Sequence, residues 1–203
     1  MNNRACCDLH IHSTYSDGSL SPAEIVRAAA AARLAAVSVT DHDTTAGQPE
    51  ALAAGRETGV DVLTGIEFSA EERELEIHIL GYLFDPNDRA LRVRLESLER
   101  SRRERAMIMI ERLRACGVDV TLEEVSSAAG SGTIGRPHVA KILLRRGIVA
   151  TFQEAFERFI GYGRSCYVAK ESISLEQVVG LIRDAGGAAV WAHPGNMIRN
   201  GDI

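Results

Sequence analysis

Short apolar runs alternate with amphipathic stretches over the first 85 residues of the sequence and again near its end. The apolar runs have the length and composition of buried β-strands. They cover residues 6–11, 35–39, 61–67, 75–84 and 188–192. The amphipathic stretches have apolar residues at helical spacing and cover residues 22–32, 49–58 and 175–185. This alternation predicts an α/β fold, arranged as a barrel or a sheet.

A different pattern fills the middle of the chain, where the strand-like runs stop. Four helical segments are expected there, near residues 88–115, 122–129, 137–146 and 152–160. Thr121 followed by Glu124 matches the capping-box pattern of a helix start. We therefore expect a small α-helical domain at residues 86–165, inserted between two parts, 1–85 and 166–203, of one α/β domain.

The composition is that of an ordinary globular protein. Of the 203 residues, 45% are hydrophobic and 25% are charged, which is sufficient for a substantial core. No apolar run approaches the roughly 18 residues of a membrane span, and the N-terminus lacks a signal-peptide pattern. Four scattered cysteines do not indicate a disulfide framework. We therefore expect a cytoplasmic protein with no membrane partner.

Charge is distributed unevenly between the two predicted domains. Residues 86–165 carry 15 Lys and Arg against 10 Asp and Glu, whereas the remainder carries 8 against 18. A basic helical insert thus accompanies an acidic α/β body. Most arginines of the first inserted helix are expected to pair with its glutamates and to serve only solubility.

The most informative polar pattern is His10 followed by His12 at the end of the first predicted strand. Residues i and i+2 of a strand point to the same face, so both imidazoles can reach one metal ion. Further metal-binding residue types follow at or near the ends of other predicted strands. These are Asp17, His42, Glu67, His78 and His193. Since strand ends deliver side chains to one edge of a sheet or barrel, we expect a shared metal site there.

Several motifs around these residues resemble those of the PHP family, the metal-dependent phosphoesterases named after polymerases and histidinol phosphatases. The matching segments are Asp8–Ser13, Ser16–Gly18, Thr40–Asp43, Gly65–Glu67, Glu76–Gly81 and Ala192–Gly195. The resemblance covers residues 6–85 and about 166–195. The stretch between them looks like the helical insert of the nucleotide-phosphatase and 5′-to-3′ exoribonuclease branch. The resemblance implies a distorted (β/α)7-type barrel with an inserted helical domain.

The same resemblance implies a ligand set for two to three divalent ions. His10, His12 and Glu67 would hold the first ion. Glu67 would bridge to a second ion held by His78 and His193, and Asp17 with His42 would hold a third. Imidazoles combined with shared carboxylates suit manganese, zinc or iron better than calcium or magnesium. A metal-bound hydroxide would then be the nucleophile, without a separate catalytic side chain.

Arg136 and His138 are the expected substrate-binding residues. Gly135 and Pro137 predict a turn followed by a helix start, and a helix N-terminus suits an anion. The insert of similar family members carries an Arg and a His here that approach the substrate phosphate. The alternative is that both residues serve capping and packing.

The sequence departs from the family pattern near its end. The family continues to a late motif whose Asp and His complete the first and third ion sites. No Asp-x-His follows His193, and five strand candidates stand where the family barrel has seven. We therefore expect an incomplete barrel, with the activity of this chain by itself in question.

The expected function is hydrolysis of phosphate esters in nucleotides or short oligonucleotides. Examples are the 3′-phosphate of a nucleoside bisphosphate and RNA degraded from its 5′ end. Stable binding of duplex DNA is not expected. The alternatives are a noncatalytic PHP-like regulatory domain, a histidinol phosphatase and a DNA exonuclease. A C–N hydrolase is less favoured because it would usually want a strand-borne lysine, and both lysines, Lys141 and Lys170, lie in or beside the insert.

Overall fold

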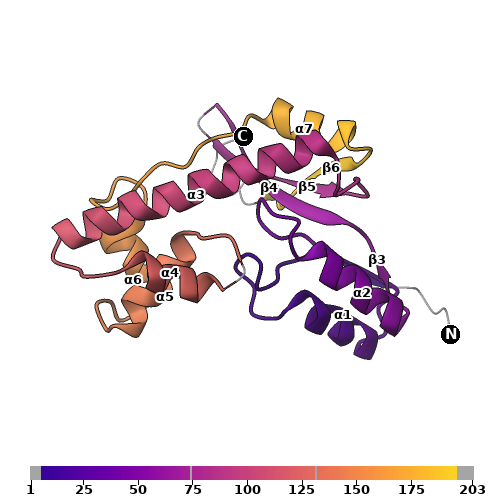
Figure 1. Ribbon diagram of the computed structural model, residues 1–203, viewed down its shortest axis with the longest axis horizontal. Helices are drawn as coiled ribbons and strands as arrows, with labels where there is room; N and C mark the ends of the chain where they lie inside the picture. Colours follow the sequence, from indigo (N-terminus) through magenta and orange to yellow (C-terminus); the bar gives the residue numbers. More distant parts are fainter. Residues whose placement is uncertain (1–5, 74, 131, 196–203) are drawn as a thin grey trace. The chain divides into compact units, whose positions relative to one another are not determined.

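The computed structural model describes residues 6–73, 75–130 and 132–195 (Figure 1). Residues 1–5 and 196–203, at the ends of the ranges expected for the α/β domain, lie outside the described part. The chain divides into two compact units. The first, called here the αβ unit, is formed by residues 1–95 and 172–203, and the second, called the helical unit, by residues 96–171.

The αβ unit contains two three-stranded sheets. Strands β1 (Cys7–Ile11), β2 (Ala36–Val39) and β3 (Asp61–Val62) are parallel and lie in that order. Strands β4 (Gly65–Glu72), β5 (Leu75–Tyr82) and β6 (Ala188–Trp191) form an antiparallel sheet in the same sequential order. The α/β fold predicted from the sequence is thus confirmed.

One expected strand, residues 61–67, divides into β3 and β4 at Leu63 and Thr64, so the described residues form six strands where five were predicted. After the break, the segment following β2 pairs with β4. The Glu67 N–H donates to the Asp41 carbonyl at 3.2 Å, and the Asp43 N–H donates to the Glu67 carbonyl at 2.9 Å. These bonds place His42 beside Glu67, as a parallel bridge between the two sheets.

The helices of the αβ unit agree with the predicted stretches. They are α1 (Pro22–Ala31), α2 (Gln48–Thr58) and α7 (Leu175–Asp184). Helices α1 and α7 begin with capping boxes, since Ser21 and Ser174 each accept a hydrogen bond from the third helical N–H. Helices α1 and α2 pack on the parallel sheet, and their shared core contains Val26, Val37 and Ala51.

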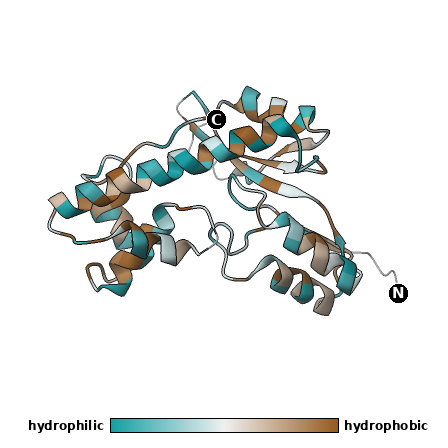
Figure 2. Cartoon of the chain, in the orientation of Figure 1, coloured by the Kyte–Doolittle hydropathy of each residue, from teal (hydrophilic) through white to brown (hydrophobic). Residues whose placement is uncertain are grey.

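The helical unit is formed by the second part of α3 (Arg89–Ala115) with α4 (Leu122–Ala129), α5 (Arg136–Arg145) and α6 (Phe152–Ala155). A π-helical turn, Phe156–Ile160, continues α6 and completes the helix expected at 152–160. Hydrophobic and hydrophilic residues mix along α3 (Figure 2). Its buried residues Met109 and Leu113 pack with Val139 and Leu143 of α5.

None of the helices within the described residues is both long enough and apolar enough to cross a membrane.

Candidate metal centre

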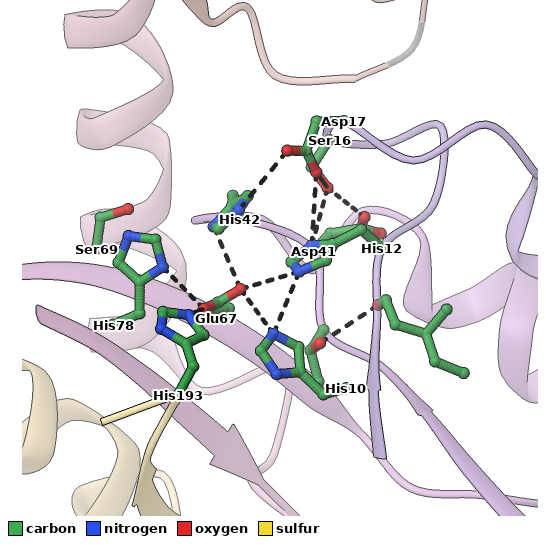
Figure 3. Close-up of polar contacts among 12 residues, drawn as sticks. His10, His12, Ser16, Asp17, Asp41, His42, Glu67, Ser69, His78 and His193 are labelled. Atoms are coloured by element: carbon green, nitrogen blue, oxygen red, sulfur yellow. Dashed lines mark hydrogen bonds and ion pairs between the residues drawn. The ribbon is translucent and has the colours of Figure 1, made fainter. Parts of the chain in front are cut away.

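Strand β1 delivers two imidazoles to one carboxylate. The Nε2 atoms of His10 and His12 each lie 3.0 Å from Oε2 of Glu67, and 3.3 Å from each other (Figure 3). The pair therefore points to one face, as the i, i+2 spacing predicts. Nitrogen atoms this close, facing one carboxylate oxygen, form a ready set of donors for a cation.

Glu67 is the centre of the site. Its side chain is 1% exposed, and β4 holds it between the end of β2 and strand β5. While Oε2 faces His10 and His12, Oε1 lies 2.9 Å from Nδ1 of His78 and 3.0 Å from Nε2 of His193. Each carboxylate oxygen thus faces its own pair of histidines. A carboxylate in this arrangement can bridge two ions.

His42 and Asp17 extend the site on the side of His12. The His42 Nε2 atom lies 3.9 Å from Oδ2 of Asp17, and His12 Nδ1 lies 3.7 Å from Oδ1 of Asp17. The ring of His42 stacks on that of His12 with centroids 4.5 Å apart. Among the described residues there are three groups of three side chains in which all the donor atoms lie within 4.8 Å of one another. They are His10 with His12 and Glu67, His12 with Asp17 and His42, and His42 with Glu67 and His78.

The Nδ1 atom of His42 is buried and has no hydrogen-bond partner among the described residues, although Glu67 Oε2 lies 3.5 Å away. A buried polar atom without a partner costs free energy, and native proteins rarely leave one unsatisfied. A cation bound between these donors would satisfy it. Both this atom and the mixture of imidazole and carboxylate donors fit a divalent ion of the manganese, zinc or iron kind.

The electrostatics of the site centre on the Glu67 carboxylate. Burial opposes its charge, but hydrogen bonds to His12 and His78 outweigh burial and hold the pKa of Glu67 well below its usual range. Burial likewise opposes charge on His78, yet its hydrogen bonds to Glu67 and Glu76 raise the pKa of His78 to about 9. For His42, burial dominates and lowers the pKa. The Glu67 carboxylate therefore stays ionised and stabilises positive charge beside it, as a ligand of a cation must.

Two residues of the site have a left-handed backbone. His193 has φ of 34° and Asp43 has φ of 52°, a region that non-glycine residues rarely adopt. The Ala192 N–H donates to the His78 carbonyl at 2.9 Å, so the end of β6 is fixed to β5 immediately before His193 turns toward Glu67. Strained backbone of this kind concentrates at functional sites, which supports a role for His193.

All seven expected metal ligands thus gather around or next to Glu67 in the αβ unit. The two expected substrate residues lie in the helical unit. Arg136 is the first residue of α5, and its guanidinium lies 5.8 Å from the ring centroids of both Phe156 and Tyr167. His138 is buried, and its Nδ1 accepts a hydrogen bond of 3.0 Å from the Gly135 N–H. This hydrogen bond caps the helix, which is the role given above as the alternative to substrate binding for His138.

Sequence reasoning assigned no role to Asp41 or Gln48, which are both 1% exposed and contact the segments that carry the ligands. Asp41 is bound by Ser13 and Ser16, in the loop between His12 and Asp17. The sequence signal that could have identified Asp41 is its position directly before His42 in a matching motif.

Gln48 stands at a helix start, where nothing in the sequence pattern distinguishes it.

Comparison with known proteins gives this constellation its family. The family model of the PHP domain matches residues 8–183. The chain belongs to the PHP domain family. Two relatives support this membership: a 5′-3′ exoribonuclease of Haemophilus influenzae, 36% identical over 187 residues, and a 3′,5′-nucleoside bisphosphate phosphatase of Chromobacterium violaceum, 39% identical over 189 residues. The matches cover 92% and 93% of this chain but 68% and 66% of the relatives, so the chain spans about two thirds of their length.

Solved structures agree with this PHP membership. A candidate metal-dependent phosphoesterase of Bifidobacterium adolescentis superimposes with a TM-score of 0.87 at 32% identity, over 95% of this chain and 68% of the other. A Chromobacterium violaceum protein described as an amidohydrolase, with bound sulfate and no metal, gives 0.85 at 38% identity, over 94% and 68% of the two chains. The resemblance to the PHP family stated from the motifs is therefore confirmed. PHP phosphoesterases depend on divalent metal ions, which agrees with the donor atoms around Glu67.

Proposed function

We propose that this PHP chain is a metal-dependent phosphoesterase that hydrolyses phosphate esters of nucleotides or short oligonucleotides. The observation that carries the proposal is the position of Glu67, whose two oxygens each face a separate pair of histidines. Two ions held a few ångströms apart are the usual arrangement for displacement at phosphorus.

The ligand assignment follows the two sides of Glu67. His10 and His12 with Oε2 would hold one ion, and His78 and His193 with Oε1 would hold the second. Asp17 and His42 would contribute to a third. Two to three ions of manganese, zinc or iron suit these donors, because nitrogen ligands favour transition metals over calcium and magnesium. Bound there, the ions would supply an activated water and neutralise charge on the phosphate.

Arg136 is the proposed phosphate-binding residue. It stands at the N-terminus of a helix of ten residues, where backbone N–H groups also favour an anion. Among the described residues no carboxylate pairs with its guanidinium, which is oriented by the rings of Phe156 and Tyr167. A guanidinium that is oriented but not paired with a carboxylate can bind a phosphate with two hydrogen bonds.

The substrate class is inferred from the relatives. One is named for activity on RNA and another for activity on a nucleoside bisphosphate. Both substrates present a phosphate ester next to a ribose, and both are compatible with an arginine that binds a phosphate. A nucleotide substrate would place the reaction in the cytoplasm.

A substrate screen with added Mn²⁺ tests the proposal. It compares a nucleoside 3′,5′-bisphosphate, nucleoside monophosphates, short 5′-phosphorylated RNA, histidinol phosphate, duplex DNA and a simple N-acyl amide. Phosphate release and mass spectrometry of the products identify the bond that is cleaved. We expect turnover of the bisphosphate or of the RNA, and its loss in Glu67→Gln.

Three results would contradict the proposal in different ways. Cleavage of histidinol phosphate alone would assign the chain to the histidinol phosphatase class. Cleavage of the amide alone would favour the activity for which the Chromobacterium violaceum structure is described. Binding of metal without turnover of any substrate would favour a noncatalytic domain.

A further inference from the structure

The carboxylate of Asp41 connects two segments that carry proposed metal ligands. Asp41 lies directly before His42, and its side chain is buried. Its Oδ1 accepts a hydrogen bond from the Ser16 hydroxyl at 2.6 Å (Figure 3). Oδ1 also accepts from the Ser13 N–H at 2.7 Å, and Oδ2 accepts from the Ser13 hydroxyl at 2.6 Å. Three short bonds to one carboxylate form a strong anchor.

The donors flank the loop that carries Asp17. Ser13 directly follows His12, and Ser16 directly precedes Asp17. Within the loop, the Ser16 and Gly18 N–H groups donate to the Ser13 carbonyl at 3.0 and 2.9 Å. A Cβ added at Gly18 would lie 2.0 Å from the His12 carbonyl oxygen, so the turn closes tightly on itself. The loop is therefore a compact unit, held from outside at both of its ends by Asp41.

Asp17 itself has weak contacts. Its side chain is 40% exposed, and its oxygens lie 3.4 Å from the Ser16 hydroxyl, 3.7 Å from His12 and 3.9 Å from His42. None of these contacts is short enough to fix the carboxylate by itself. The position of Asp17 therefore depends on the backbone of its loop, and through Ser16 on Asp41.

The burial of Asp41 also needs a reason. Within the described residues no Lys or Arg pairs with its carboxylate, which is bound by neutral donors alone. Burying a carboxylate is costly unless its hydrogen bonds offset the lost hydration. Serine hydroxyls and a backbone N–H do so here, and the same bonds fix the geometry of the loop.

We infer that Asp41 is a positioning residue for the ion site formed by His12, Asp17 and His42. It acts on that site from two directions, through the loop that holds Asp17 and through the peptide bond to His42. The inference rests on the proposed metal centre and deepens it. Residues that orient metal ligands without touching the ion change metal affinity by about 10- to 100-fold.

Stepwise binding of Mn²⁺, followed by calorimetry and by electron paramagnetic resonance of free Mn²⁺, tests this role. The direct-ligand variant Asp17→Asn first identifies which binding step belongs to the site. Asp41→Ala should weaken that same step by about 10- to 100-fold, and Ser16→Ala should weaken it less. The Mn²⁺-binding step that depends on Glu67 and His78 should keep its affinity in both variants. A general loss of structure would weaken both binding steps.

Asp41→Asn separates position from charge. The amide oxygen of Asn can still accept from the Ser13 N–H and the Ser16 hydroxyl, while its NH₂ group can donate to the Ser13 hydroxyl. Asp41→Asn should therefore bind Mn²⁺ more tightly at this step than Asp41→Ala. Equal weakening in the two variants would mean that the negative charge matters and would overturn the positioning role. Asp61→Asn, at an exposed site on β3, is the matched control and should bind like the unaltered chain.

The remaining outcomes separate this inference from the proposed function. If the unaltered chain binds no Mn²⁺, the metal centre and the proposed function both fail. If it binds Mn²⁺ but Asp17→Asn loses no step, or Asp41→Ala and Ser16→Ala bind normally, the inference alone fails. Should circular dichroism show that Asp41→Ala does not fold, Ser16→Ala decides, and its unchanged affinity would overturn the inference.

Discussion

Nδ1 of His78 lies 2.9 Å from Oε1 of Glu67, although the β4–β5 register places Leu80, and not His78, directly opposite Glu67. The two residues are diagonal neighbours on one face of an antiparallel pair, a distance that long side chains can span. A slip of one residue would move His78 to the other face. The register of β4 against β5 thus places His78 on the same face as Glu67, within reach of the metal site.

Replacement of Glu67 is expected to affect metal binding more than any other single change. In Glu67→Gln the bridging charge is lost and one acceptor oxygen becomes a donor that faces histidine nitrogens. We expect the affinity for Mn²⁺ and the phosphoesterase turnover both to fall by more than about 100-fold, beyond the range of changes outside the ligand set. Atomic absorption of the purified protein measures metal content. Glu72→Gln, on the solvent-exposed end of the same strand, is the control and should keep the normal metal content. Full metal stoichiometry in Glu67→Gln would refute the bridging role.

Arg136 should act on substrate and leave the metal content unchanged. Arg136→Ala removes a charge-assisted hydrogen bond of about 1.5–3 kcal/mol, so kcat/KM for a nucleotide substrate should fall about 10- to 100-fold. Arg136→Lys should recover only part of this loss, because an ammonium group cannot bind phosphate in a planar, bidentate manner. Steady-state kinetics with metal analysis measures both quantities.

Arg145→Ala, at the exposed other end of α5, is the matched control for Arg136 and should retain normal kinetics. Unchanged kinetics in Arg136→Ala would leave that residue with a role in packing against Phe156 and Tyr167 only.

Gly65 lies where β4 approaches the backbone of β2, and it should not tolerate a side chain. A Cβ added there would lie 2.0 Å from Ser38 Oγ and 3.0 Å from the Val39 carbonyl oxygen. We expect Gly65→Ala to lower the free energy of unfolding by about 1–3 kcal/mol, as overpacking of a core does. Urea denaturation in EDTA measures the change without a contribution from metal.

Gly180, within α7, provides the opposite case. A Cβ there would meet no atom within 4 Å. Gly180→Ala should raise the free energy of unfolding by about 0.5–1 kcal/mol, because alanine loses less backbone entropy in a helix. The reverse ranking of the two variants would show that the approach of β4 to β2 is looser than the structure has it.

Gln48 should matter for stability although, among the described residues, its side chain hydrogen-bonds to no proposed ligand. Its amide donates to the Val39 carbonyl at 2.7 Å and to the Gly65 carbonyl at 2.8 Å, and it accepts from the Gly65 N–H at 3.4 Å. Gln48→Leu keeps the volume but leaves buried backbone groups without partners. We expect a loss of about 2–4 kcal/mol in the free energy of unfolding, measured by the same denaturation.

The control for Gln48 is Gln153→Leu on the exposed surface of α6, where the side chain donates to Glu157 and to no other residue of the described part. The free energy of unfolding of that variant should be close to that of the unaltered chain. A normal free energy of unfolding in Gln48→Leu would mean that water replaces the lost hydrogen bonds.

Much of the secondary structure could be predicted because its signals are local. The capping boxes at Ser21 and Ser174 and the helix-period pattern depend on residues within one or two turns of each other. The division of the strand at 61–67 could not be predicted in this way. It occurs because Gly65 lets β4 approach β2, a contact between segments more than twenty residues apart.

By itself, the sequence determined the PHP family and the identity of the metal-binding residue types, since the spacing of His10 and His12 and the matching motifs are properties of the chain alone. Only the tertiary structure decided how those residues combine. Which oxygen of Glu67 faces which histidines depends on strand register and on the strand break. The role of Asp41 depends on hydrogen bonds to a loop 25 to 28 residues away. Such contacts follow from the packing of distant segments, which no local pattern encodes.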